Sequence, residues 1–162
     1  MKAKKVSWLA LFIALSVVGS MMKVPAPISS VALDSFPPLI AAVLLGPAVG
    51  ALAGTLGHLA SAFIGGFPMG PLHVIVAAEM AVIVWVYGKL YTSGLKRSAF
   101  LSFVFLNGLA APAPFIFFLG IPFYLNVMPS LTIAAVFNGI IAYILLPKLA
   151  SAFTKRYSRI HA

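Results

Sequence analysis

The chain contains no cysteine and very few acidic residues. Without cysteine among its 162 residues, it can form no disulfide, no thiolate metal site and no thiol nucleophile. Charged residues make up 8% of the sequence and hydrophobic residues 62%, which excludes a soluble globule, because such a surface needs several times more charge. The mean hydropathy of +1.11 indicates an integral membrane protein.

The length limits how often the chain can cross a bilayer. A transmembrane helix needs about 20 residues, so there is room for six or seven helices and for no additional soluble domain. We therefore predict an all-α membrane protein, with residues 1–162 forming a single substrate-binding domain of six transmembrane helices in one compact bundle. The predicted helices span residues 6–22, 34–45, 48–64, 71–87, 98–119 and 129–146.

The first apolar run has the appearance of a secretory signal peptide, because it follows the basic stretch MKAKK. We expect it to be the first transmembrane helix instead. The run is long enough to cross by itself, and the remainder would still be a multispan membrane protein.

Prolines and glycines set the predicted connections. The expected outer loops are residues 23–33, with Pro25 and Pro27, the GGFPMG loop at 65–70, and residues 120–128. Asp34 and Ser35 offer an N-cap for the helix 34–45, which is short for a crossing and is either tilted or begins below the outer surface. Pro112 and Pro114 are expected to break the helix 98–119.

Glycines recur along the start of the predicted helix 48–64. Gly46, Gly50, Gly54 and Gly57 lie three or four residues apart, and small residues at this spacing let helices approach closely in lipid. We therefore expect the face that also carries His58 to be packed inside the bundle.

The basic residues predict the orientation. With six crossings, all Lys and Arg residues except Lys23 fall on the side of the termini, so we expect both termini in the cytoplasm of a bacterial cell, with the chain as a multi-pass protein of its membrane. These residues form short clusters between hydrophobic runs and no basic face, so nucleic acid is not an expected partner.

Ionisable groups concentrate in residues 31–80, which hold both acidic residues and two of the three histidines. A charged residue at the centre of a membrane helix costs roughly 2.5–3.5 kcal/mol, so such groups are functional candidates. On the predicted topology they line an outward-facing pocket under the outer loops, and nothing comparable lines the cytoplasmic half. The candidate substrate-binding residues are Asp34, His58, Phe67, His73, Glu79, Asn107, Tyr124 and Asn138.

Each candidate also has a structural interpretation. Asp34 can be only an N-cap, His58 an interhelical hydrogen-bond partner, and His73 a residue in interfacial water. Glu79 lies six residues after His73 and points about 120° away from it on an ideal helix, so it can be a structural partner of another helix. Asparagine side chains often form hydrogen bonds between membrane helices, so Asn107 and Asn138 can be interhelical partners. Phe67 and Tyr124 can be aromatic anchors at the membrane interface.

Several kinds of chemistry lack their motifs. The glycine-rich run GPAVGALAGT has no Lys-Ser/Thr ending of a phosphate loop, and there is no HExxH pair and no GxSxG nucleophile turn. His58 and His73 fall on different helices, with no short spacing of metal ligands. We expect no metal, no cofactor and no enzymatic activity.

The pattern Ala10-Leu11-Phe12-Ile13-Ala14 lies on the first of six short predicted helices, below a pocket under outer loops. In these features the chain resembles the substrate-binding S-component of energy-coupling-factor (ECF) vitamin transporters. The resemblance implies transport partners: a transmembrane coupling subunit and two ATPases. It also implies that Ala10 and Ala14 form a flat strip that docks on the coupling subunit, since alanines one turn apart allow close helix contact.

The segment ALDSFPPLIAAVLLGPAVGALAGTLGHLASAFIGGFPMGPLHVIVAAEM looks most like the S-components associated with α-ribazole, a precursor of the lower ligand of vitamin B12 (cobalamin). This resemblance implies that Asp34, His58, Phe67, His73 and Glu79 border the ligand. Metal-specific relatives begin with Met-His, whereas this chain begins with Met1-Lys2, which argues against cobalt or nickel as substrate.

Other functions remain open at this point. A different vitamin, such as riboflavin or a pterin, is the second interpretation. A membrane enzyme using Asp34, His58 and Glu79, or a small channel or exporter, are the further alternatives.

Overall fold

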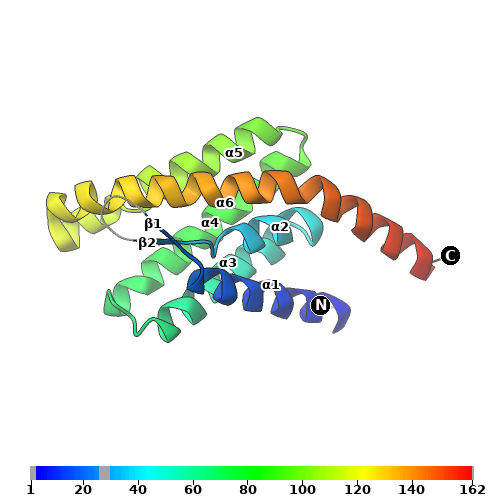
Figure 1. Cartoon of the computed structure of the whole chain (residues 1–162), viewed down its shortest axis with the longest axis horizontal. Coiled ribbons are helices and arrows are strands. Elements are labelled where there is room, and N and C mark those ends of the chain that lie inside the picture. Colours follow the sequence, from blue (N-terminus) through cyan, green and yellow to red (C-terminus); the bar gives the residue numbers. More distant parts are fainter. Residues whose placement is uncertain (1–2, 26–29, 162) are drawn as a thin grey trace.

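The structure is a bundle of helices with one short two-stranded ribbon (Figure 1). The computed structural model describes the backbone of residues 3–25 and 30–161, and side chains are described for 4–22, 32–151 and 153. The helices are α1 (Ala3–Met21), α2 (Phe36–Leu44), α3 (Pro47–Ile64), α4 (His73–Thr92), α5 (Lys96–Phe105) and α6 (Ile116–His161), with short 3₁₀ segments η1 (Gly70–Leu72) and η3 (Ala113–Phe115) and a π-helical segment η2 (Leu106–Ala110).

Within the described residues, four helical segments are long and apolar enough to cross a membrane. They are Lys4–Met21, Pro47–Ile64, Gly70–Thr92 and Lys96–Ser151. The predicted all-helical membrane fold is therefore confirmed.

The last and longest of these segments contains a reversal of the chain at Gly120. This residue has φ 82° and ψ 167°, outside the helical region, and a positive φ is readily available only to glycine. Residues 116–119 continue the line of α5, and the chain then runs back beside it toward the C-terminus (Figure 1).

The expected outer loop at 120–128 is wrong. Residues 121–128 are helical, and the last helix, predicted at 129–146, extends to His161. Pro122 falls in the first turn after the reversal, where a missing N–H does little harm. Pro129 and Pro147 lie inside the helix; the helix persists because hydrocarbon offers the backbone no other hydrogen-bond partners.

The predicted break near Pro112 and Pro114 is confirmed. Regular α-helix stops at Phe105, the chain passes through the π-helix η2, and a 3₁₀ turn follows at Ala113–Phe115. Proline removes a helical hydrogen bond and clashes with the preceding turn, which accounts for the irregular stretch.

The expected extended segment at 23–33 forms a ribbon. Strands β1 (Lys23–Pro25) and β2 (Ser30–Ala32) pair antiparallel, with Val24 opposite Val31. Pro27 of the predicted loop lies outside the described residues.

Glycines of α3 allow close contacts with three neighbouring helices, as predicted. Gly50 lies against Ala42 of α2, and Gly57 against Ser16 of α1, so closely that a Cβ atom on Gly57 would lie 2.6 Å from the Ser16 Oγ. Gly54 faces Val84 of α4, where a Cβ atom would approach the Val84 Cγ2 to 3.1 Å. Gly46 instead forms the turn before α3 with φ 107° and open space around it.

Helix α2 lies at the centre of the bundle. Residues Leu39 to Ala42 are 0–2% exposed, and α2 contacts α1, α3, α4 and α6. Helix α2 therefore begins inside the protein. Its first N–H groups therefore start away from water and need partners from the protein.

Asn138 of α6 supplies those partners. Its Oδ1 accepts hydrogen bonds from the backbone N–H groups of Ser35 (3.0 Å) and Phe36 (2.9 Å). Its Nδ2 donates to the carbonyl oxygens of Ala32 (3.0 Å) and Ala134 (2.9 Å), and the side chain is 1% exposed.

The predicted capping by Asp34 and Ser35 is therefore only partly right. Ser35 occupies the N-cap position but makes no side-chain capping bond. Its Oγ donates to the Asp34 Oδ1 at 2.9 Å, and the acceptor that caps α2 comes from another helix.

Replacing Asn138 by alanine is expected to destabilise the fold strongly. Two backbone N–H groups at the start of α2 would lose their acceptor, at a cost of about 2 kcal/mol or more in the free energy of unfolding. Thermal unfolding of the purified protein in detergent measures the effect. Asn126→Ala is the matched control, because Asn126 is exposed on the same helix. Equal melting temperatures for the two variants would contradict the capping role.

Candidate functional site

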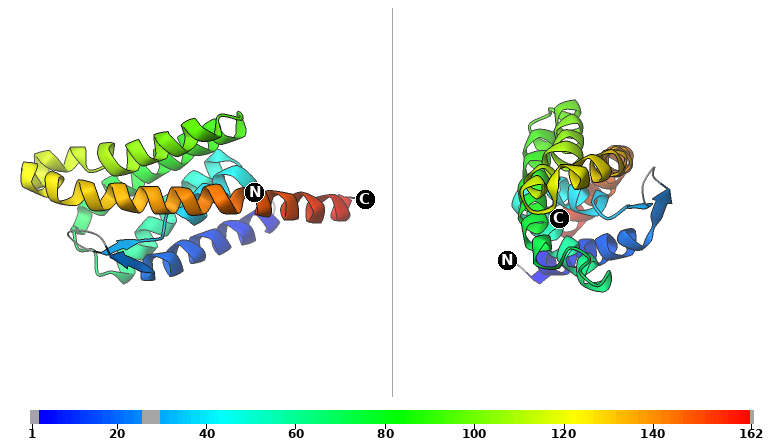
Figure 2. Two further views of the ribbon diagram at one scale, coloured as in Figure 1. Left: turned by 45° about the horizontal axis from the view of Figure 1, so that its top comes forward. Right: turned by 90° about the vertical axis from the view of Figure 1, so that its left-hand side faces the viewer.

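Three connections lie at the same end of the bundle, away from the two chain ends. The β1–β2 ribbon, the α3–α4 connection and the reversal at Gly120 lie there (Figures 1 and 2). The turns at Gly46 and Gly94 lie at the opposite end, with the described parts of both termini. We call these the ribbon end and the terminal end.

Two histidines predicted on neighbouring helices are in direct contact. The Nε2 of His58, on α3, lies 3.1 Å from the Nδ1 of His73, at the start of α4, with ring centroids 5.2 Å apart. The Phe67 ring lies 5.7 Å from the His73 ring. Three of the predicted site residues thus form one aromatic and hydrogen-bonding cluster, which we call the His58–Phe67–His73 cluster.

The α3–α4 connection positions this cluster through unusual backbone conformations. Gly66 and Gly70 have φ of 78° and 55°, and Phe67 has φ 48°, the one non-glycine residue in the described chain with positive φ. A bulky side chain in this region is costly, and such residues collect at binding sites, where surrounding contacts hold them. The Phe67 N–H donates to the Ala62 carbonyl at 2.8 Å, which holds the bend against α3.

The hydrogen bonds assign proton positions within the cluster. The backbone N–H of Met69 donates to the His73 Nε2 at 3.4 Å, so neutral His73 carries its proton on Nδ1 and donates to the His58 Nε2. Neutral His58 then carries its proton on Nδ1, where it can serve a further acceptor. Ser61 lies three residues along α3, and its buried Oγ has no hydrogen-bond partner within the described part of the chain.

Glu79 belongs to a separate cavity. Its side chain lines a space of about 340 Å³ between α4 and the irregular stretch after α5. The Glu79 Oε2 is buried without a hydrogen-bond partner among the residues described. The other lining residues are Ala78, Val82, Ile83, Leu106, Ala110 and Ala111. This separation agrees with the predicted divergence of His73 and Glu79 on their helix.

The π-helix η2 connects two more of the predicted residues to this region. Asn107 lies within η2, which contributes Leu106 and Ala110 to the Glu79 cavity. The Tyr124 hydroxyl donates to the carbonyl oxygen of Leu109 at 3.4 Å, so Tyr124 ties α6 to the same segment. Single π-helical turns occur frequently at functional sites.

Asp34 and Asn138 lie where β2 passes into α2. The Asp34 carboxylate accepts the Ser35 hydroxyl, and its backbone carbonyl accepts the Ser16 hydroxyl of α1. Asn138 uses both its donor and its acceptor groups within the fold, which favours the interhelical interpretation of this residue over ligand contact.

The predicted docking residues face away from the bundle. Ala10 and Ala14 are exposed on α1, together with Leu11, Leu15 and Val18, which are 45%, 40% and 55% exposed. This strip is free for contact with lipid or with another helix.

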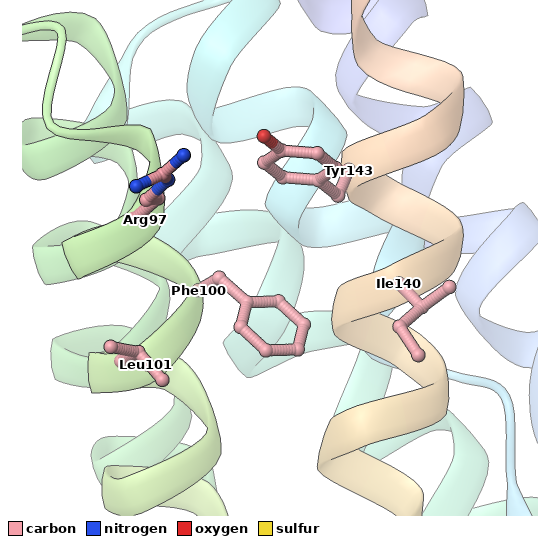
Figure 3. A pocket seen from close by; sticks show the side chains of 5 residues that line it. All are labelled: Arg97, Phe100, Leu101, Ile140 and Tyr143. Atoms are coloured by element: carbon pink, nitrogen blue, oxygen red, sulfur yellow. The ribbon is translucent and has the colours of Figure 1, made fainter.

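A second cavity was missed by the sequence analysis, which expected no comparable pocket in the terminal half. It lies between α5 and α6, has a volume of about 330 Å³, and is lined by Arg97, Phe100, Leu101, Ile140 and Tyr143 (Figure 3). The pairing of α5 with α6 creates it, and the sequence gives no signal of which faces of two apolar helices meet.

No group of three or more potential metal ligands is present among the residues that the structure describes. Within the His58–His73 pair, one nitrogen of each ring is already used in the hydrogen bond between them.

A sequence model of the family described as "ECF transporter, substrate-specific component" matches residues 4–157. The chain belongs to this family. S-components are integral membrane subunits of transporters, not enzymes, and associate with a membrane coupling subunit and ATPases. Among curated proteins, none matches this S-component closely enough to be called a relative.

Removing the Glu79 carboxyl is expected to stabilise the unliganded S-component. A buried polar group without a hydrogen-bond partner costs about 1–3 kcal/mol in mutational data, so Glu79→Leu raises the free energy of unfolding by about that amount. Thermal unfolding in detergent measures the change. Glu79→Gln retains a polar group in the cavity and is expected to gain less. A lower melting temperature for Glu79→Leu would show that the carboxyl has a stabilising partner.

Proposed function

We propose that this S-component is a multi-pass protein of a bacterial cell membrane that captures a vitamin precursor from outside the cell for ATP-driven uptake. Six crossings, with both termini in the cytoplasm, form its scaffold. The leading candidate substrate is α-ribazole, with another vitamin such as riboflavin or a pterin as the alternative.

The proposed number of crossings rests on the reversal at Gly120. The segment Lys96–Ser151 has 56 residues and would be about 84 Å long as one straight helix, far more than the roughly 30 Å of a bilayer core. Divided at Gly120, it supplies two crossings. Helix α2, with nine residues, is too short to cross alone and is completed by the ribbon in front of it.

The proposed orientation rests on the distribution of charge. Basic residues lie at helix ends that belong to the terminal end: Lys4 at the start of α1, Lys89 in the last turn of α4, and Lys96 and Arg97 at the start of α5. Lys23 begins the ribbon, at the other end. Basic residues favour the cytoplasmic side, so the ribbon end faces outward.

The His58–Phe67–His73 cluster carries the proposal of substrate binding. It places two imidazole rings and a phenyl ring together at the outward end, under a connection held in a strained conformation at Phe67. Flat rings suit a benzimidazole base, and the His58 Nδ1–H and the Ser61 hydroxyl suit ribose hydroxyls. Asp34, Glu79, Asn107 and Tyr124 are proposed to border the ligand from neighbouring elements.

Calorimetric titration of the purified protein with α-ribazole tests the substrate, with riboflavin and thiamin as controls. We expect saturable binding of α-ribazole at one site per chain. His58→Phe keeps the ring but removes its nitrogens, and Asp34→Asn removes the charge. Each is expected to weaken binding about tenfold, the value of one lost hydrogen bond in a buried site.

Thr92→Ala is the control for these variants, since Thr92 bonds only to backbone carbonyls at the far end of α4 in the described structure. Binding of riboflavin alone would make riboflavin the substrate in place of α-ribazole and would leave the proposed role in vitamin uptake unchanged. Unchanged affinity in both site variants would place the ligand elsewhere.

The exposed strip with Ala10 and Ala14 is proposed as the surface that docks on the coupling subunit. Ala14→Trp is expected to abolish co-purification with the coupling subunit and ATPases, because the indole prevents close helix contact. Ala14→Ser, which stays small, is expected to retain it. Intact co-purification of the tryptophan variant, or loss of its folded state, would contradict the docking role.

A further inference from the structure

The cavity between α5 and α6 has two chemically different ends. Figure 3 shows the Arg97 guanidinium and the Tyr143 hydroxyl together at one end, with the hydrocarbon of Phe100, Leu101 and Ile140 at the other. Leu101 and Ile140 are 65% and 42% exposed, so the cavity opens to the outside of the bundle, where lipid surrounds the protein.

The cavity forms because α5 and α6 pack at a glycine. A Cβ atom on Gly139 would lie 2.8 Å from the Phe100 Cε2, so the absence of a side chain at Gly139 allows Phe100 to pack closely against α6. Beside this contact, the two helices enclose a slot of about 330 Å³. An apolar slot that opens to a bilayer accommodates a hydrocarbon chain.

The polar end of the slot carries positive charge without a matching acid. The sequence has two acidic residues: Asp34 lies beside α2, and Glu79 lines the other cavity. Within the described residues, Arg97 has no carboxylate partner. It also lies in the first turn of α5, which has no side-chain cap, so the positive end of the helix dipole adds to its field.

We propose that this slot binds an anionic phospholipid. The Arg97 guanidinium holds the phosphate, the Tyr143 hydroxyl donates a second hydrogen bond, and one acyl chain lies against Phe100, Leu101 and Ile140. An arginine forms paired hydrogen bonds with phosphate oxygens, and basic residues near a membrane surface attract anionic lipids. A soluble anion would use the charged end only, whereas the slot is polar at one end and apolar along the rest.

The position of the slot along the bundle fits a lipid in the membrane leaflet on the side of the terminal end. Arg97 stands one residue after the start of α5, beside the turn at Gly94 that belongs to the terminal end. A phospholipid with its phosphate at this level directs its acyl chains toward the middle of the bilayer, along α5 and α6. This is the direction in which Phe100 and Leu101 follow Arg97 along α5.

Lys96 provides a matched control. It is the neighbouring cation, but its ammonium lies 5.5 Å from the centre of the Tyr91 ring and it does not line the slot. Lys96→Gln and Arg97→Gln make the same change in net charge, so any difference between them reports the site and not the overall field.

The test measures lipid bound to the full-length protein by native mass spectrometry after incubation with phosphatidylglycerol or phosphatidylcholine. The unmodified chain is expected to retain phosphatidylglycerol in preference to phosphatidylcholine. Arg97→Gln is expected to lower retention about tenfold or more, the value of a charge-assisted hydrogen bond to the phosphate. Lys96→Gln is expected to lower it less than about fivefold, because it loses only the general attraction of one basic residue. Leu101→Trp, which fills the slot from an exposed position, is expected to lower retention without removing charge.

Three outcomes would overturn the proposal. Equal retention of the two lipids would exclude recognition of the anionic headgroup. Equal losses in Arg97→Gln and Lys96→Gln would leave only non-specific attraction. Unchanged lipid retention in Arg97→Gln, with loss of co-purification with the coupling subunit, would show that a protein occupies the slot. None of these outcomes depends on which vitamin precursor the S-component binds.

Discussion

The fold depends on how the backbone N–H groups at the start of α2 find hydrogen-bond partners inside the protein. A helix that begins in a protein interior has N–H groups that water cannot reach, and each unsatisfied group costs free energy. The Asn138 side chain meets this requirement from α6, and the same side chain also bonds to the end of β2. One amide group thus joins the ribbon, the central helix and the last helix. These hydrogen bonds stabilise the burial of α2 against four other helices.

Close packing of α3 follows from the same constraint. A central helix as short as α2 leaves little surface to hold its neighbours, so α3 must approach three helices closely. Gly50, Gly54 and Gly57 make this possible, and each faces a different helix. The close approach of α3 and α4 then brings His58 beside His73. The glycines therefore position the candidate site as well as the scaffold.

Much of this arrangement could be predicted from the sequence where the signal is local. Apolar runs predicted α1, α3 and α4 to within a few residues, because length and hydropathy determine what can cross a bilayer. The small-residue spacing predicted the packed face of α3, and helix periodicity predicted that His73 and Glu79 diverge. These predictions need no knowledge of any neighbouring helix.

Other features depend on contacts between distant residues, and the sequence analysis did not resolve them. The side chain that caps α2 lies about a hundred positions away in the sequence. The sequence analysis assigned the cap to Asp34 and Ser35, because these residues directly precede the helix. Prolines at 122 and 129 suggested a loop. The helix forms nevertheless, because Pro122 falls in its first turn and hydrocarbon favours continued helix around Pro129. The contact between His58 and His73 depends on the positive φ values of residues 66, 67 and 70, which no pattern of residue types specifies.

The two cavities on either side of the fifth helical segment differ for a physical reason. The regular helix α5 forms one wall of the slot at Arg97, and the irregular stretch after it forms one wall of the cavity at Glu79. A π-helical turn adds a residue to the helix and rotates every following side chain around its axis. The segment nevertheless meets both neighbours on either side of this turn, because α5 and η2 each contact α4 and α6. Helix periodicity separates the two cavities instead: on an ideal helix Leu106 and Ala110 lie about 140–180° around the axis from Arg97 and Leu101, so a single segment can line two sites on opposite faces.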